Sequence, residues 1–195
     1  MSTAPRSAVL AAALLVLSGC VSFGPKTPDS LLTLTPTATA PAGRVASGTS
    51  ATAIVLSEFE VPQKLDVTRV PVQVTDTEIA YVKDAVWNEK PARLLRRLIA
   101  ETIRARSDRL VIDGDDPGAL AEQRVTGTLR EFGYDARTGE VVVVLDAVRA
   151  GAGSSVTTRR FEARVPGIVA EAGPVGVALN QAANTVAGEV AAWVG

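Results

Sequence analysis

The chain has 195 residues, of which 47% are hydrophobic and 21% charged, values typical of a folded globular protein. Twenty lysines and arginines nearly balance 21 aspartates and glutamates, so the net charge of −1 does not indicate a nucleic-acid binder. The sequence has no histidine and one cysteine, which excludes histidine-based catalytic relays and an internal disulfide.

The first residues have the pattern of a bacterial export signal. Arg6 precedes an apolar segment from Ala8 to Leu17, which is too short to span a bilayer because spanning needs about 20 residues. The following "LSGC" resembles a lipobox, in which a cysteine after small residues is acylated before cleavage. We therefore expect residues 1–19 to be a lipoprotein signal peptide and Cys20 to be the lipidation site and membrane anchor. The alternatives are an ordinary signal peptide with an incidental cysteine and an uncleaved buried helix.

A region rich in Pro, Thr, Ala, Ser and Gly comes next. This composition predicts that residues 20–50 form the acylated N-terminus and a flexible tether. One stretch, "SLLTLTP", favours β-structure and predicts a short strand over 30–35 that pairs at a sheet edge. Residues 51–195 are expected to form the folded domain.

The first half of this domain combines short strands with one helix. A strand is predicted in "ATAIVLSEFEVP", ending at Pro62, and two more in "RVPVQVTDTEIAYV". The segment "EKPARLLRRLIAETIRAR" has apolar residues at helical spacing, and Pro91 suits the first turn of a helix. A short strand, "DRLVID", is predicted after it.

Three longer strands are predicted in the second half, at about 122–134, 140–148 and 154–165. Their short connections contain glycine and polar residues, which favours an antiparallel meander. The chain ends in a predicted helix that starts near Pro174 and carries an apolar stripe from Leu179 to Trp193. These elements predict an α+β fold, with a largely antiparallel or mixed β-sheet and two amphipathic helices on one face in a two-layer sandwich.

The run "VVVVL", Val141 to Leu145, is apolar on both faces of its predicted strand. One face is expected to meet the helices. The other face is expected to be covered by the tether folding back or by a neighbouring loop, and the functional alternative is a protein partner or a lipid.

Two sequence patterns that superficially indicate ligand sites have simpler interpretations. Asp113, Asp115 and Asp116 begin like a calcium loop, but Pro117 and Arg124 stand where oxygen ligands are needed, so a turn is expected and no metal. The stretch "GAGSSV" lacks the third glycine of a dinucleotide fingerprint and lies where a hairpin turn is expected. We therefore expect no cofactor.

A candidate partner surface lies around the first predicted helix. Arg93, Arg97 and Arg104 project to one side of this helix, and Trp87 precedes it. The arginines are either a solvated helix face or a docking patch for an acidic protein surface or phospholipid head groups. Trp87 is either a core residue or part of the same partner surface.

The chain resembles the ABC-type transport auxiliary lipoproteins. The resemblance rests on "LSGC", "SLLTLTP", "VLSEFEVPQKLDVTRV" and "IAYVKDAVWNEKPARLLRRLI", in which Tyr81, Trp87, Pro91 and Leu94 fall where the family places an aromatic, a tryptophan, a proline and the start of its helix. Leucines at 31 and 32 depart from the family's tyrosines, and "DVTRV" lacks its usual Arg-Pro. The likeness covers nearly the whole chain after Cys20.

This resemblance implies a non-enzymatic accessory subunit, anchored in the outer membrane and facing the periplasm. Its implied partners are an MCE-domain protein with its permease and ATPase, which move phospholipid or other hydrophobic molecules between membranes. Val21 follows the cysteine where an aspartate would favour the inner membrane, which agrees with outer-membrane sorting. The alternative is a free periplasmic lipid carrier with its own acyl-chain pocket. A homo-oligomer remains an open alternative.

Overall fold

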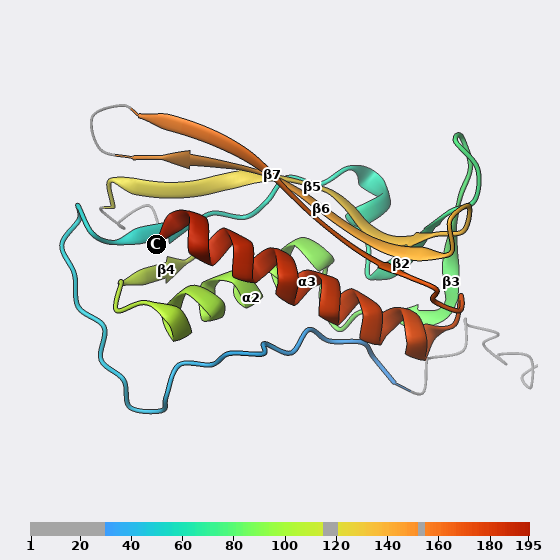
Figure 1. Ribbon diagram of the computed structural model, residues 1–195, viewed down its shortest axis with the longest axis horizontal. Coiled ribbons are helices and arrows are strands. Elements are labelled where there is room, and N and C mark those ends of the chain that lie inside the picture. The colour runs from blue at the N-terminus through green and yellow to red at the C-terminus, as the bar shows by residue number, and fades with distance from the viewer. Residues whose placement is uncertain (1–29, 115–120, 152–154) are drawn as a thin grey trace, which may run out of the picture.

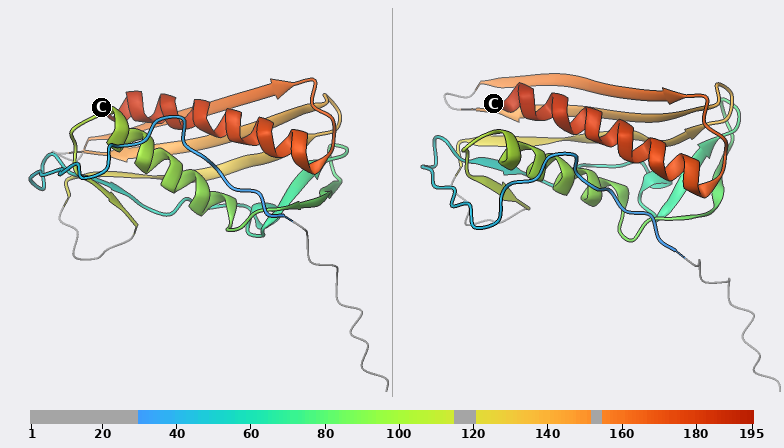
Figure 2. Two further views of the ribbon diagram at one scale, coloured as in Figure 1. Left: turned by 90° about the horizontal axis from the view of Figure 1, so that it is seen from below. Right: turned by 60° about the horizontal axis from the view of Figure 1, so that its bottom comes forward.

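The computed structural model describes residues 30–114, 121–151 and 155–195. In this part of the chain, a seven-stranded mixed sheet and two helices form two layers, with both helices on the same face of the sheet (Figures 1 and 2). The predicted α+β fold is therefore confirmed. No helix within the described ranges has the length and apolar character needed to cross a bilayer.

The elements follow the predicted order along the chain. The strands are β1 (Ile54–Leu56), β2 (Arg69–Gln73), β3 (Ile79–Val86), β4 (Val111–Asp113), β5 (Gln123–Asp135), β6 (Glu140–Ala150) and β7 (Val156–Pro166). The helices are α2 (Pro91–Arg106) and α3 (Ala172–Val194), and a 3-10 turn, η1 (Gln63–Leu65), lies between β1 and β2.

Strand β5 organises the sheet. Its first residues pair in parallel with β1, and its last two pair in parallel with β2, so two strands pair with the same edge of β5. Its other edge pairs antiparallel with β6, and β6 pairs antiparallel with β7. The predicted β5–β6–β7 meander is thus confirmed, while the parallel pairs with β1 and β2 make the whole sheet mixed.

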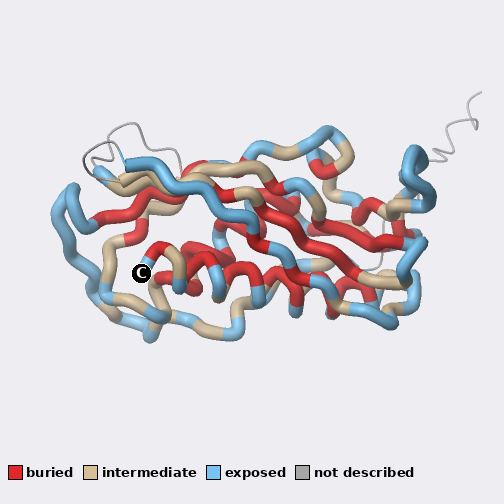
Figure 3. The backbone as a smooth tube through the Cα atoms, turned by 45° about the horizontal axis from the view of Figure 1, so that its top comes forward, coloured by how far each residue is buried: buried red, intermediate tan, exposed pale blue. Residues whose placement is uncertain are grey.

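The core lies between the sheet and the helices, where Figure 3 shows buried backbone along both layers. Trp87 packs edge-to-face on Phe132 with 5.5 Å between ring centroids, and Phe161 packs in the same way on Trp193, also at 5.5 Å. The buried alanines of α3 let this helix lie close to α2, β6 and β7.

Two of the predicted strands are shorter than expected. The strand expected over 30–35 is reduced to a single parallel bridge, in which Leu32 N donates to Val86 O at 2.7 Å and Asn88 N donates to Leu32 O at 2.9 Å. The chain then leaves the sheet edge and crosses the helix layer. The strand expected before Pro62 is limited to β1, although Glu60 still forms an isolated bridge with Thr128.

The second face of β6 is not covered by the N-terminal segment, which we define as residues 30–50. This segment lies along the helices, on the opposite side of the molecule (Figure 2). Val142 and Val144 are 7% and 6% exposed and line two hollows together with charged side chains and residues of the 60–64 loop; Pro71, Gln73 and Ile79 of β2 and β3 also line the hollow at Val142. Of the expected covers, the neighbouring loop is therefore the one observed, together with the apolar stems of charged side chains.

Candidate functional site

A groove of about 380 Å³ lies between the N-terminal segment and helix α2. Thr33, Leu34 and Pro36 line it from the N-terminal segment, and Arg97 and Arg104 line it from α2. Its remaining lining residues are Asn88, Leu94, Leu98, Glu101 and Asp113. Two of the three arginines predicted to form a partner surface therefore face the same groove.

Both groove arginines have partners within the chain. Arg97 Nη1 lies 2.7 Å from Glu89 Oε1. Arg104 Nη2 donates to Val111 O at 3.0 Å, and its Nη1 lies 3.8 Å from Glu101 Oε2. Because these guanidinium groups are held in position, they present a fixed pattern of positive charge beside the carboxylates.

The neighbouring arginines of α2 lie in different environments. Arg93 is exposed, and among the described residues its side chain has no hydrogen bond or ion pair, although its backbone N donates to Lys90 O at 3.1 Å. Arg96, in contrast, points into the molecule and is 8% exposed, with its Nε 3.2 Å from Asp113 Oδ1. The arginine row is therefore split into an exposed group and one buried ion pair.

Trp87 does not belong to the exposed surface, which corrects its assignment as a candidate partner residue. Its side chain is 1% exposed because the N-terminal segment bridges to it and Phe132 packs on its ring. The indole Nε1 is buried and has no hydrogen-bond partner among the residues that the structure describes. The core interpretation of Trp87 is therefore the one that the structure favours.

The acidic stretch after β4 is only partly described. Asp113 is engaged by Arg96, and the described residues contain no group of acidic, histidine or cysteine side chains suited to a metal ion. Asp115 and Asp116 lie outside the described residues, as does Cys20. Of "GAGSSV", the described residues Gly151 and Ser155 are paired by a backbone hydrogen bond of 2.9 Å, as expected for a hairpin connection.

The N-terminal segment is attached to both helices by specific contacts. Leu32 packs against Gly176, where an added Cβ would lie 2.7 Å from Leu32 Cδ2. The Asn184 side chain accepts a hydrogen bond from Thr37 N at 2.9 Å and donates one to Thr35 O at 2.9 Å. These contacts join residues that are far apart in the chain, so no local sequence pattern indicated them.

Further along the segment, two contacts reach helix α2. Ala40 N donates to Glu101 Oε1 at 2.8 Å. Arg44 donates to the carbonyl oxygens of Arg104 and Ser107 at 2.6 and 2.8 Å, and it also pairs with Asp108. Arg44 therefore satisfies carbonyl groups at the C-terminal end of α2, where a cation is favoured by the helix dipole.

The outer face of the sheet, which is the face away from the helices, carries a network of ion pairs that the sequence analysis did not identify as a unit. Asp146 on β6 accepts hydrogen bonds from Arg160 at 2.6 and 2.8 Å, and it also pairs with Arg130. These hydrogen bonds hold the pKa of Asp146 well below its usual range. The alternation in "TTRRFEARV" was the available signal, because it indicated one hydrated face.

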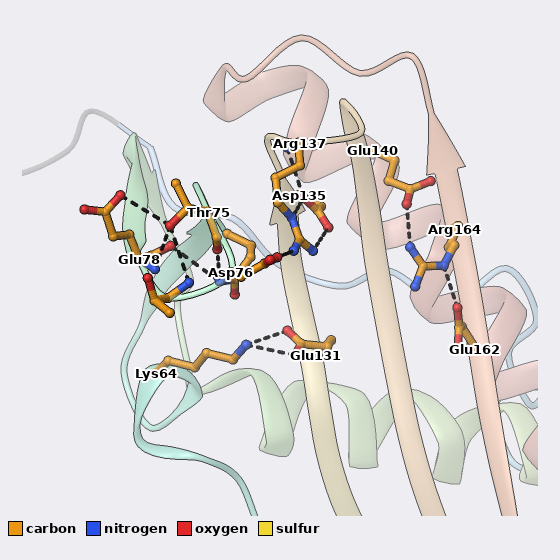
Figure 4. Close-up of polar contacts among 12 residues, drawn as sticks. Lys64, Thr75, Asp76, Glu78, Glu131, Asp135, Arg137, Glu140, Glu162 and Arg164 are labelled. Atoms are coloured by element: carbon orange, nitrogen blue, oxygen red, sulfur yellow. Dashed lines mark hydrogen bonds and ion pairs between the residues drawn. The ribbon is translucent and has the colours of Figure 1, made fainter.

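Figure 4 shows the network at the other end of the outer face, around the β5–β6 hairpin. Arg137 lies between Asp135 and Asp76, and Arg164 contacts both Glu140 and Glu162. Hydrogen bonds from Arg137 lower the pKa of Asp135, although burial of this carboxyl acts in the opposite direction. Arg137 and Arg164 thus each form ion pairs with two carboxylates.

A hollow of about 680 Å³ runs over this face between the 60–64 loop and β7. Val144 lies at its base, and charged side chains form much of its lining: Glu60, Lys64, Arg130, Glu131, Arg160, Glu162 and Arg164. A site with this lining suits a polar partner better than an acyl chain, which needs mainly apolar walls.

Comparisons with known proteins agree with this architecture. The structure is similar to that of protein XCC0632 from Xanthomonas campestris, with a TM-score of 0.66, 18% identity, and coverage of 84% of this chain and 94% of that one. It is also similar to the crystal structure of an uncharacterized protein, with a TM-score of 0.65, 13% identity, and coverage of 85% and 100%. At these identities the likeness shows the shared fold alone.

Sequence comparison is more specific about the family. No curated protein matches the chain. The family model of the ABC-type transport auxiliary lipoprotein component matches residues 32–191, which include all the strands and most of α3. The chain therefore belongs to the ABC-type transport auxiliary lipoprotein family.

Proposed function

We propose that this chain is an outer-membrane lipoprotein that faces the periplasm and acts as an accessory subunit of an MCE-type ABC transporter for phospholipid or other hydrophobic molecules. The observation that carries the proposal is the family match over residues 32–191, together with the "LSGC" sequence that ends at Cys20. Acyl chains on Cys20 attach the protein to the membrane, and the transporter supplies the ATPase and permease on other chains.

The path of the N-terminal segment supports a short attachment to the membrane. Cys20 precedes Ser30, the first described residue, by ten positions, and a fully extended chain of this length spans about 35 Å at most. From Leu32 to Arg44 the segment is held on the helices by the contacts described above. The domain of the anchored protein therefore stays close to the membrane surface.

The chemistry of the surface supports a binding role rather than catalysis. The family is a transport auxiliary component, and the chain contains no histidine, the residue most often used as a general base. Many of its described charged side chains form ion pairs with one another, including those of Arg137, Asp146 and Arg164. We therefore expect this chain to contribute assembly contacts to the transporter.

The proposed contact surface for the partner is the exposed side of α2, with Arg93 and Arg97. Arg93 is the clearest test because its side chain has no ion pair among the described residues, so its replacement breaks none. We expect Arg93→Glu with Arg97→Glu to weaken co-purification of the transporter without lowering the melting temperature by more than a few degrees. Lys83→Glu, an exposed charge reversal on β3, is the control. Equal recovery of the transporter with both variants contradicts this assignment.

The decisive experiment is a crosslinked pull-down of the full chain from membranes through a C-terminal tag, with proteins and lipids both identified by mass spectrometry. Recovery of an MCE-domain protein with its permease and ATPase, without stoichiometric lipid, is the expected result. Stoichiometric lipid without those proteins identifies the chain as a free lipid carrier instead.

The anchor is tested separately by labelling cells with radioactive palmitate. We expect the wild-type chain to incorporate the label and the Cys20→Ser variant to lose it. Label that persists in the variant, or that is absent from the wild type, contradicts acylation of Cys20. The association with the transporter is tested independently by the pull-down.

A further inference from the structure

Strand β7 forms one edge of the sheet. Among the described residues it pairs with β6 alone, and Figure 2 shows no described element beyond it. It runs for eleven residues, and its register with β6 is continuous from Val156 to Pro166 without a bulge. A long, regular and uncovered edge presents a row of unpaired backbone groups, which is the geometry that accepts an additional strand.

The hydrogen-bond pattern identifies these backbone groups. Gly151 N donates to Ser155 O, so this pair is hydrogen bonded, and such pairs alternate along an antiparallel ladder. The odd-numbered residues of β7 therefore bond to β6, and the even-numbered ones, such as Arg160 and Glu162, point their N–H and C=O groups to the free edge. Pro166 has an even number, so its missing N–H costs no bond to β6.

The other two edges of the sheet are protected. Strand β4 has only three residues, Val111 to Asp113. Strand β3 contains Asp84 at φ 58°, an interruption of regular extended backbone, and its end is capped by the bridge to Leu32. Short length and local irregularity are ways in which proteins prevent unwanted edge pairing, so β7 is the described edge without such protection.

The first half of β7 is exposed on both faces. Val156, Thr157, Thr158, Arg159 and Arg160 are all exposed, as the pale stretch of β7 in Figure 3 shows. The apolar Val156 retains 62% of its accessible surface. This half of the strand is rich in β-branched residues, which favour pairing, yet it is left without a neighbour on its outer edge.

We propose that β7 is the site at which a second copy of this chain adds to the sheet, with the two β7 strands antiparallel about a two-fold axis at Phe161. This register places Arg160 of each copy directly opposite Glu162 of the other on the outer face. It also places Thr158 opposite Arg164. The inference does not rest on the proposed transport role, because it follows from the edge and its charges.

Two-fold registers shifted by one residue in either direction are electrostatically worse. An axis at Arg160 places two Arg160 side chains directly opposite each other, and an axis at Glu162 does the same with two carboxylates. An axis at Phe161 places Arg160 opposite Glu162 and overlaps all eleven residues of β7, whereas an axis at Ala163, which also pairs a glutamate with an arginine, overlaps only residues 160–166. The ion-pair network of one outer face, in which Arg160 already binds Asp146 and Glu162 binds Arg164, then continues into the second copy.

The arrangement also places both N-terminal segments on the same side. The two-fold axis of an antiparallel edge pair stands normal to the sheet, so the helix layers of both copies share one side of the joined sheet. The N-terminal segments lie on the helix layer. Both copies can therefore be anchored in one membrane. The proposed acylation of Cys20 requires this, because each copy would carry its own anchor.

Disulfide crosslinking of the full chain in membranes tests the register. Thr157 and Val165 face each other across the axis in a non-hydrogen-bonded pair, about 4.5 Å apart at Cα, which suits a disulfide. Within one copy they are separated by about 27 Å of strand and cannot bond. We expect Thr157→Cys with Val165→Cys to give a disulfide-linked dimer on a non-reducing gel.

Two controls accompany this experiment. The wild-type chain, with Cys20 alone, reports any crosslink through that thiol. Thr157→Cys with Arg164→Cys shifts one thiol to the opposite face of the strand, and we expect no dimer from it. Equal dimer from both double variants overturns the register, and its absence from both overturns the pairing.

Thr158→Pro tests the backbone contact in the detergent-solubilised full chain, with mass measured by light scattering. Its N–H points to the free edge, so proline removes a bond to the second copy and none to β6. We expect the wild type and Thr158→Ala to be dimeric and Thr158→Pro to be monomeric, with equal melting temperatures. A monomeric wild type, or a dimer unaffected by the proline, overturns the proposal. If the Thr157→Cys, Val165→Cys chain instead forms a disulfide with a different protein, the second copy is wrong and β7 pairs with a strand of that protein.

Discussion

The two faces of the sheet bury their residues in different ways. On the helix side, Val141, Val143 and Leu145 of β6 are fully buried in the core to which α3 contributes. On the outer face, Val144 is almost as buried, but its covers are charged side chains and a loop. Equal loss of accessible surface therefore does not mean equal packing. The helix face stabilises the fold through close contact, whereas the outer face presents a charged surface that remains able to rearrange.

The largest expected difference between the two faces concerns adjacent valines of β6. We expect Val143→Ala to lower the free energy of unfolding by about 2–3 kcal/mol, because it removes two methyl groups and leaves a cavity in the core. Val144→Ala is the matched substitution, expected to cost about 1 kcal/mol because long charged side chains can close over the gap. Urea unfolding of both variants measures the difference. Equal losses contradict the contrast between the faces.

A smaller effect is expected where the N-terminal segment meets α3. Asn184→Ala removes the side-chain hydrogen bonds to Thr35 and Thr37, which we expect to lower the free energy of unfolding by about 1 kcal/mol. The same change increases hydrogen exchange at the amide of Thr37, which loses its acceptor. Gln181→Ala, an exposed change on the same helix, is the control. An unchanged exchange rate at Thr37 argues against this attachment.

The smallest expected effect is a pH dependence on the outer face. Because hydrogen bonds from Arg160 and Arg130 depress the pKa of Asp146 in the folded state, its contribution to stability is complete above the unfolded-state pKa near 4. That contribution is lost as the pH falls below this value. We expect Asp146→Asn to lower the melting temperature at pH 7 and to differ less from the wild type at pH 3.

The exposed pair of Asp66 with Lys90 provides the control for this prediction. Its members are 55% and 50% exposed, so Asp66→Asn is expected to change stability little at either pH. A wild-type and Asp146→Asn difference that is constant from pH 7 to pH 3 contradicts the assigned role of the carboxylate.

The candidate site could be predicted only in part. The helical spacing of Arg97 and Arg104 indicated a common side of α2, where both line one groove, because spacing within one helix is a local property; Arg93, predicted with them, does not line this groove. The burial of Trp87 was not predictable from its place before the helix, since it depends on Phe132 and on Leu32, both distant in sequence. Likewise, nothing in the local pattern distinguished the inward-facing Arg96 from its exposed neighbours.

The sequence by itself determined the export signal pattern, the two helices, the β5–β6–β7 meander and the family. Each depends on periodicity, turn residues or motifs within a short stretch of chain, and these act on the backbone wherever the stretch lies. The tertiary structure alone decided that β5 pairs with both β1 and β2, that the N-terminal segment crosses the helices, and that β7 is left as an open edge. Those features depend on which distant surfaces meet, and a local pattern contains no information about its distant partner.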